Sequence, residues 1–467
     1  MVGVYNMNND VKIETYNKLK NGQIKCKHCG STDIFFNEKT GMLKCNFCRN
    51  EFHQEKLDEV NEDLSKLYGK KIGAATQNIV ADSKNMVTIK CQGCGAEIVI
   101  DTSETVQARC HWCRSFLSIN EQVPNGSVPD VVLPFSVRKE EAEIKIKEFV
   151  NKRKFFAHPK FKKEFTTENI LGVYFPYMLV DLNAHATFEG EGEEETRRYT
   201  VGTGDNEKTY YDADLYEVGR DFDVTIDDLS IEANSDRLNL NSNQKTNNII
   251  NSIMPFDTEN CVVWNANYLK GFSSEKRDTN IEQLNNIVTT QAKDIARIAI
   301  NDTLKKYDRG VCWKKENLII KGERWKTSYL PIWLYSYQEK RKDKSILHYV
   351  AVNGRNNKTM GSIPINMKKL ILFSILFEIP TLLVALFVSL DYAKILALGG
   401  IIFFLVMFFR YRNSNKRYKY EKDSKKQISN IKSIDKFIKS KKRLSSSFMD
   451  GANNRKVNGN RTNFFKL

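Results

Sequence analysis

Eight of the ten cysteines stand in four Cys-x-x-Cys pairs. Fifteen residues separate the first pair from the second, and fifteen separate the third from the fourth. Two residues between cysteines allow a tight turn to direct both sulfurs at one ion, and four thiolates complete the tetrahedral shell of a structural Zn²⁺. We therefore predict two zinc sites, whose ligands are Cys26, Cys29, Cys45 and Cys48 in the first and Cys91, Cys94, Cys110 and Cys113 in the second.

The two cysteine sets are copies of one pattern at an offset of 65 residues, which indicates duplicated zinc ribbons. Gly30 and Gly95 directly follow the first pair of each set, where the backbone can need a positive φ. A closed four-thiolate shell leaves no place for a water ligand, so we expect structural sites. Iron and a redox dithiol are the alternatives that the thiols leave open. Nearby histidines are expected on the surface and not as ligands (His28, His53, His111).

Residues 128–365 are expected to form the main folded domain, to which the ribbons attach. Two aromatic segments that contain proline, 174–179 and 329–334, are expected to be buried strands, and each follows a Pro-Phe pair and a helical pattern. Asn353-Gly354 is typical of a hairpin turn. This region is predicted to be an α+β domain with a mainly antiparallel sheet, made of two related halves. It contains no nucleotide-binding, metalloprotease or hydrolase motif, so we expect no enzyme and no catalytic or cofactor-binding residue. Its acidic stretches, 189–195 and 212–228, match no calcium-binding loop and are read as a solvated hairpin face.

An apolar pair of segments follows. Leu370 to Leu390 contains one charged residue, Glu378, and Ile395 to Phe409 contains none. Two buried helices of a soluble domain are the alternative, but the length and apolarity favour a transmembrane helical hairpin. Lys368 and Lys369 precede it and Arg410 follows, so the positive-inside rule places both ends in the cytoplasm.

The net charge of +15 is concentrated behind this hairpin. Residues 410–467 hold 18 Lys and Arg against 4 Asp and Glu, so +14 of the charge lies there and the remaining residues are nearly neutral. The stripe Ile428, Ile431, Ile434 and Ile438 suits an amphipathic helix on anionic lipid, and a disordered basic tail is the alternative. The ribbons themselves are close to neutral, which disfavours DNA binding by them.

The chain is therefore predicted to be a multidomain α+β protein. It comprises zinc ribbon 1 (20–54), a helix and flexible linker (55–88), zinc ribbon 2 (89–120), the α+β domain (128–365), the transmembrane hairpin (368–410) and the basic tail (411–467). Cys261 and Cys312 remain outside the pairs and are expected to be buried core thiols. The N-terminus has no signal-peptide pattern, and the paired cysteines suit a reducing compartment.

With these features together, the chain resembles the bacterial membrane-anchored TFIIB-type zinc ribbon proteins, which are often labelled as replication helicases. The resemblance covers about 90–410. It rests on the Cys-x-x-Cys ribbons, the Pro-Phe start of a helix, Tyr268-Leu269-Lys270-Gly271-Phe272, the strand Leu330 to Leu334, and the Asn-Gly turn that ends near Pro364. It implies partners of the phage-shock and band-7 (SPFH) types. From the residues and this resemblance we expect a cell-membrane protein that recruits cytoplasmic or membrane proteins to the bilayer through its ribbons. The alternative is a membrane-bound nucleic-acid-binding protein.

Overall fold

The computed structural model describes residues 13–16, 26–53 (except 32, 38 and 39), 63–73, 76, 86–101 (except 93 and 95), 108–117, 122–123, 129–201, 208–234, 253–341, 344–385, 398–412 and 444–459. Within these residues the fold is a mixed α/β arrangement rich in sheet. One large sheet takes in most strands, and three short strands form a second sheet.

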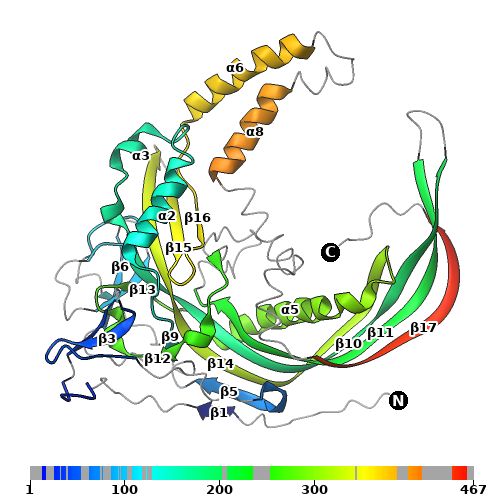
Figure 1. Ribbon diagram of the computed structural model, residues 1–467, viewed down its shortest axis with the longest axis horizontal. Coiled ribbons are helices and arrows are strands. Elements are labelled where there is room, and N and C mark those ends of the chain that lie inside the picture. The colour runs from blue at the N-terminus through cyan, green and yellow to red at the C-terminus, as the bar shows by residue number, and fades with distance from the viewer. Residues whose placement is uncertain are drawn as a thin grey trace.

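Three long strands form the middle of the large sheet. β10 (Leu171–Val201) pairs antiparallel with β11 (Lys208–Glu232) on one side and with β14 (Gly310–Arg341) on the other. Figure 1 shows the three strands curving together, with helix α5 (Ile281–Ile300) in their concave face. Leu284, Val288 and other residues at helical spacing on α5 are buried against the apolar side chains of these strands, so this helix closes one core of the protein.

The two aromatic segments that contain proline lie side by side. In the antiparallel register of β10 and β14, Tyr174 is opposite Pro331 and Pro176 is opposite Tyr329. The tyrosines are buried, which confirms the expectation of core strands. β14 continues into a hairpin of β15 (Lys344–Asn353) and β16 (Thr359–Gly361). The turn between β15 and β16 begins after Asn353, as predicted from the Asn-Gly pair.

Helices α2 (Lys139–Asn151) and α3 (Pro159–Glu164) pack beside this hairpin. The Pro-Phe pair that precedes α2 places Phe135 against Phe272, with ring centroids 4.7 Å apart, and against Trp333. The indole of Trp333 donates a hydrogen bond to the carbonyl of Val137 (2.8 Å). The shorter elements are β8 (Gln122–Val123), β9 (Val131–Val132), β12 (Val262–Val263), η4 (Thr167–Asn169), η7 (Thr258–Asn260), η8 (Ala266–Leu269) and η9 (Asn301–Leu304).

The segment between the ribbons was predicted to be a flexible linker from Gly69 onwards, but its first residues form a strand. β5 (Gly69–Gly73) lies between β1 (Ile13–Tyr16) and β14, parallel to both, so the start of the supposed linker is part of the sheet. Ile72 is buried in the core that α5 closes, which fixes this strand in place. The helical pattern before it gives only one short turn, η2 (Leu64–Lys66), in the described part of that segment; Leu57 and Val60 lie outside the described residues.

The apolar pair forms helices α6 (Met367–Ala385) and α8 (Gly399–Arg412), which pack against each other. Figure 1 shows them extending away from the sheet. Among the residues that the structure describes, no helix is both long enough and apolar enough to cross a membrane. Residues 386–390, which complete the expected first span, lie outside that part of the chain, and so do residues 391–397, the expected turn and the start of the second span. The isoleucine stripe of the tail also lies outside it. Farther along the tail, β17 (Leu444–Gly459) pairs with β11.

Candidate metal centres

The Cys-x-x-Cys turns share one backbone geometry. In all four, the amide of the first cysteine donates to the carbonyl five residues on, at 2.8–3.0 Å. In the described turns, the carbonyl of the first cysteine also accepts a bond from Gly30, Arg49 or Arg114, four residues on. These three residues have positive φ (73°, 62° and 64°). The prediction for Gly30 is confirmed, Gly95 lies outside the described residues, and arginine fills the same conformation after each second pair.

The predicted ligands come together in two groups of four. The Sγ atoms of Cys26 and Cys48 are 3.4 Å apart and those of Cys29 and Cys45 are 3.6 Å apart. The second group repeats both distances, with Cys91–Cys113 at 3.4 Å and Cys94–Cys110 at 3.6 Å. A tetrahedron with Zn–S bonds of about 2.3 Å has edges of about 3.8 Å, whereas a disulfide needs about 2.05 Å. Each group can therefore hold one metal ion, and its donor set and spacing suit zinc.

Burial and hydrogen bonds within each group shift the pKa values of the thiols in opposite directions. Those of Cys26, Cys45 and Cys94 are lowered, which favours the thiolate form that a metal needs, and those of Cys29, Cys48 and Cys110 are raised. The N–H of Cys48 lowers the pKa of Cys45 to about 6. The thiol of Cys110 lowers the pKa of Cys94 to about 5 through its hydrogen bond. With all four positions taken by sulfur, neither site has an open coordination position, so a structural role is the chemistry that the arrangement supports.

Ribbon 1 forms a small sheet of its own. β2 (Ile34–Asn37), β3 (Met42–Cys45) and β4 (Glu51–Phe52) pair only with one another among the described strands. The ring of Phe36 lies 5.4 Å from that of Tyr268, and Lys270 pairs with Asp33 at 3.7 Å. Both of these anchor residues belong to the Tyr-Leu-x-Gly-Phe segment. Ribbon 1 is therefore attached to the body at one side, and its turns face solvent.

Ribbon 2 is built into the large sheet instead. Its hairpin, β6 (Met86–Lys90) and β7 (Glu97–Asp101), continues through β13 (Ser273–Glu275), which pairs with both β7 and β10. The second turn is held on the other side, where Arg114 donates to the carbonyl of Ser336 and lies over the ring of Tyr335. The hydroxyl of Ser336 donates to the carbonyl of His111 (2.5 Å).

Phe47 and Trp112 occupy the same position in the two copies, one residue before the last cysteine, and their surroundings are opposite. Phe47 is 81% exposed, whereas Trp112 is 6% exposed. The indole N–H of Trp112 donates to Oε1 of Glu275 at 2.6 Å, and its ring packs against Phe175 and Tyr349. Trp112 therefore fastens ribbon 2 to the body, and ribbon 1 presents its corresponding aromatic side chain to solvent.

Two expectations about neighbouring residues were wrong. His111 was expected on the surface but is 1% exposed, and its Nδ1 lies 3.1 Å from the hydroxyl of Ser273. It is buried because the turn that carries it is covered by the sheet. Cys312 was expected in the core, yet it is exposed near the start of β14, whereas Cys261 is buried as expected. His28 and His53 are exposed, as predicted.

A buried charged cluster across three strands was not predicted from the sequence. Asp181 on β10 accepts from Nε of Arg324 (2.6 Å) and lies 3.6 Å from Nζ of Lys326, which is 3.1 Å from Asp228. Burial raises the pKa of Asp181, but Lys326 and Arg324 outweigh this and hold it at about 2. Asp181, Asp227 and Asp228 are close enough to share a cation, but the two bases already supply the positive charge, so we treat this cluster as structural.

Farther along the same strands, Glu189 pairs with Lys315 and Glu191 with Lys314. All four side chains are well exposed. This agrees with a solvated hairpin face rather than a calcium site.

Comparison of the chain with protein-family models, curated proteins and solved structures found no match.

Proposed function

We propose that this chain is a membrane-tethered adaptor, in which ribbon 2 braces the body, ribbon 1 recruits a protein partner, and the α6–α8 pair anchors the body to a bilayer. The observation that carries the proposal is the divergence of the two ribbons. In ribbon 2 the second turn packs against the body through the buried Trp112, whereas in ribbon 1 the corresponding Phe47 at the tip is 81% exposed.

The surface of the helix pair supports the membrane anchor. Both helices expose many large apolar side chains, which is costly in water and favourable in hydrocarbon. This argues against the alternative of two helices buried in a soluble domain. The exposed side chains are Ile371, Leu372, Ile375, Leu376, Phe377, Ile379, Leu382, Leu383 and Val384 on α6, and Ile401, Ile402, Leu405 and Val406 on α8.

The polar group within this apolar surface has an internal partner. Glu378 on α6 accepts a hydrogen bond from the amide of Gly400, in the first turn of α8. The positive end of a helix dipole stabilises a carboxylate. Gly400 permits the close approach, since a Cβ there would lie 2.5 Å from the carbonyl of Ser374. Glu378 therefore fastens the two helices together, and insertion does not require a partner's membrane helix to satisfy it.

The recruiting surface is the tip of ribbon 1. Both of its metal-binding turns are exposed, and Phe47 is flanked there by the exposed residues Lys27, His28 and Arg49. Exposed aromatic and arginine side chains are the types that dominate protein–protein contacts. The family resemblance implies a partner of the phage-shock or band-7 type at a cytoplasmic membrane surface, with both chain ends in the cytoplasm. We propose no catalytic step, because the metal shells are closed.

Two measurements on the full-length chain test the adaptor. The first is extraction of membranes with alkaline carbonate, from which the wild-type chain stays in the pellet and a chain lacking 370–409 does not. The second is affinity capture from solubilised membranes with wild type, Phe47→Asp and a distant control, Lys315→Gln. The adaptor predicts a protein partner that is lost only with Phe47→Asp, while zinc content stays at two ions per chain.

Two results would count against this function. A wild-type chain released by carbonate has no membrane anchor. If Phe47→Asp captures the partner as well as wild type does, ribbon 1 is not the recruiting surface. If ribbon 1 retains nucleic acid in a salt-sensitive way and no protein, the nucleic-acid-binding alternative is favoured.

A further inference from the structure

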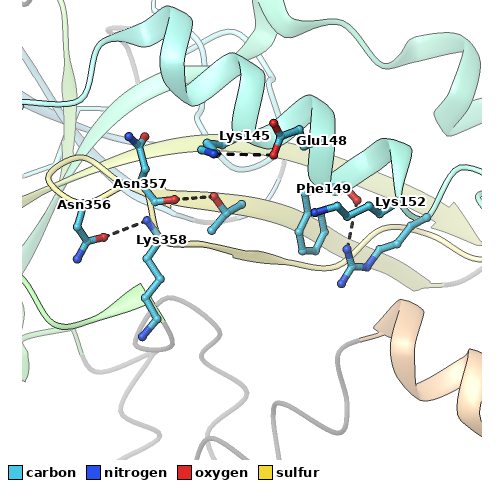
Figure 2. A pocket seen from close by; sticks show the side chains of 9 residues that line it. Lys145, Glu148, Phe149, Lys152, Asn356, Asn357 and Lys358 are labelled. Atoms are coloured by element: carbon cyan, nitrogen blue, oxygen red, sulfur yellow. Dashed lines mark hydrogen bonds and ion pairs between the residues drawn. The ribbon is translucent and has the colours of Figure 1, made fainter. Parts of the chain in front are cut away.

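A groove lies between the second half of α2 and the turn that joins β15 to β16. Its volume is about 480 Å³. Figure 2 shows Lys145, Glu148 and Lys152 on the helix side and Asn356 and Asn357 on the turn side. Lys145, Lys152 and Arg153 line the helix side against a single carboxylate, and the turn adds amide and hydroxyl groups, so the lining suits an anion.

Arg153 lies at the end of this groove, with its guanidinium against the ring of Phe149. Its Nη1 donates to the carbonyl of Phe149 at 3.2 Å, and its guanidinium lies 3.7 Å from the centre of the Phe149 ring. Its Nε is buried and has no hydrogen-bond partner among the described residues. Within the same part of the chain, no carboxylate pairs with this guanidinium. Burial and the nearby charge of Arg410 lower the pKa of Arg153 to about 10.

Further cations gather beside Arg153. We call the set Lys152, Arg153, Lys154, Lys162, Lys369 and Arg410 the basic collar. Burial and the charges of Lys369 and Lys154 lower the pKa of Lys162, so cations from α3, from the segment after α2 and from the start of α6 repel one another here. Residues 151–164 contain six Lys and Arg against one Glu. Like charges crowded in this way cost stability unless anions screen them.

The basic collar surrounds the point where the apolar helix pair leaves the body. An aromatic wedge joins the two parts: the ring of Phe156 lies 5.8 Å from Phe373 on α6, 6.3 Å from Phe403 and 5.7 Å from Tyr411 on α8. The hydroxyl of Tyr411 accepts the amide of Phe156 at 3.0 Å. Lys369 donates to the carbonyl of Phe155. The collar is therefore fixed relative to the helices, at the height where a bilayer's headgroups would begin.

We propose that the groove and the basic collar bind the phosphate of an anionic phospholipid headgroup, with Arg153 as the main anion ligand and Lys152 beside it. Phosphate is the shared chemistry of a lipid headgroup and of free phosphate, and the continuity of the collar with the apolar helices favours the lipid. The acyl chains would then lie along the exposed side chains of α6 and α8. This inference rests on the membrane anchor of the proposed function and assigns it a lipid specificity.

The test uses the full-length chain in a neutral detergent and native mass spectrometry with added phosphatidylglycerol, phosphatidylcholine or inorganic phosphate. We expect selective retention of phosphatidylglycerol. Loss of a surface cation weakens attraction to anionic lipid by about fivefold, so Lys152→Gln should reduce retention by about that factor and Lys152→Gln/Arg153→Gln by considerably more. Lys314→Gln/Lys315→Gln, near the start of β14 and outside the lining of the groove, removes the same charge and should change nothing.

Equal retention of phosphatidylglycerol and phosphatidylcholine overturns the proposal, and so does selectivity that survives the double variant. Inorganic phosphate bound as tightly as phosphatidylglycerol overturns the assignment to lipid. Lys152 is exposed, so its single variant keeps the test valid if the double variant unfolds. Because the assay is in detergent, it can fail while carbonate extraction still shows a membrane anchor, so failure of this inference is distinct from failure of the proposed function.

Discussion

Replacing the two equivalent aromatic residues of the ribbons by alanine should have very different consequences. Trp112→Ala removes a side chain that is 6% exposed, together with its ring contacts to Phe175 and Tyr349. Truncation of a buried Trp typically lowers the free energy of unfolding by about 3–5 kcal/mol. Phe47→Ala removes a side chain that is 81% exposed, and substitutions at such positions usually stay within about 0.5 kcal/mol. We therefore expect a difference of roughly 3 kcal/mol between two substitutions at the same repeat position.

A third variant separates packing from hydrogen bonding. Trp112→Phe keeps most of the buried area but removes the N–H that donates to Glu275, whose side chain is buried. Leaving a buried acceptor without that donor costs about 1–3 kcal/mol, so Trp112→Phe should fall between the other two variants.

The assay is denaturant unfolding of the full-length chain in neutral detergent, with amide hydrogen exchange across 97–101 and 273–275. Trp112→Ala should speed exchange in both strands, since they pair with each other. Zinc content is measured alongside, to separate loss of docking from loss of metal. A Phe47→Ala variant as destabilised as Trp112→Ala would refute the assignment of opposite roles to the two ribbons.

Three further predictions concern the metals and the buried charges. The purified chain should hold two zinc ions; Cys29→Ser and Cys94→Ser should each reduce this to one by elemental analysis, but only Cys94→Ser should also weaken the large sheet. The pKa of Asp181 is about 2, below its ordinary 3.8, so its charge stabilises the fold above about pH 4 and this contribution is lost as the pH falls towards 2. Asp181→Asn should therefore lower the free energy of unfolding by about 2 kcal/mol at neutral pH, and the difference from wild type should shrink between pH 4 and 2; a constant difference would contradict the charge argument. Glu378→Leu should leave the chain in the membrane pellet but speed amide exchange at Gly400, because it removes the acceptor of that amide; unchanged exchange would show that the carboxylate does not fasten α8.

Features set by nearby residues were predictable from the sequence. The Cys-x-x-Cys spacing fixes the ligands because each turn is closed by bonds within six residues. The apolar stripe of α5 and the Asn353 turn are local patterns of the same kind, and the structure contains both. The burial of the two aromatic proline strands followed from composition alone.

Features that depend on pairing across the chain were not predictable in this way. Ribbon 2 joins the body through β7 and β13, which are more than 170 residues apart in sequence. The attachment of ribbon 2 to the sheet also buries His111. A second long-range pairing places β5 beside β14, where a linker was expected. One signal was present: Ile98-Val99-Ile100 does not alternate with polar residues, which is typical of a strand covered on both faces.

The opposite burial of Phe47 and Trp112 places the two copies of the duplication under different constraints. A substitution at 112 must be matched at 175, 275 and 349, so in any related chain these four positions should change together. Phe47 belongs to no hydrophobic core among the described residues, so under the proposed adaptor function its variation should follow the surface of the protein that ribbon 1 binds. An alignment of related chains would therefore test both proposed roles. Covariation of position 112 with positions 175, 275 and 349 would support the bracing role of ribbon 2, and covariation of position 47 with a second protein would support the proposed recruitment by ribbon 1.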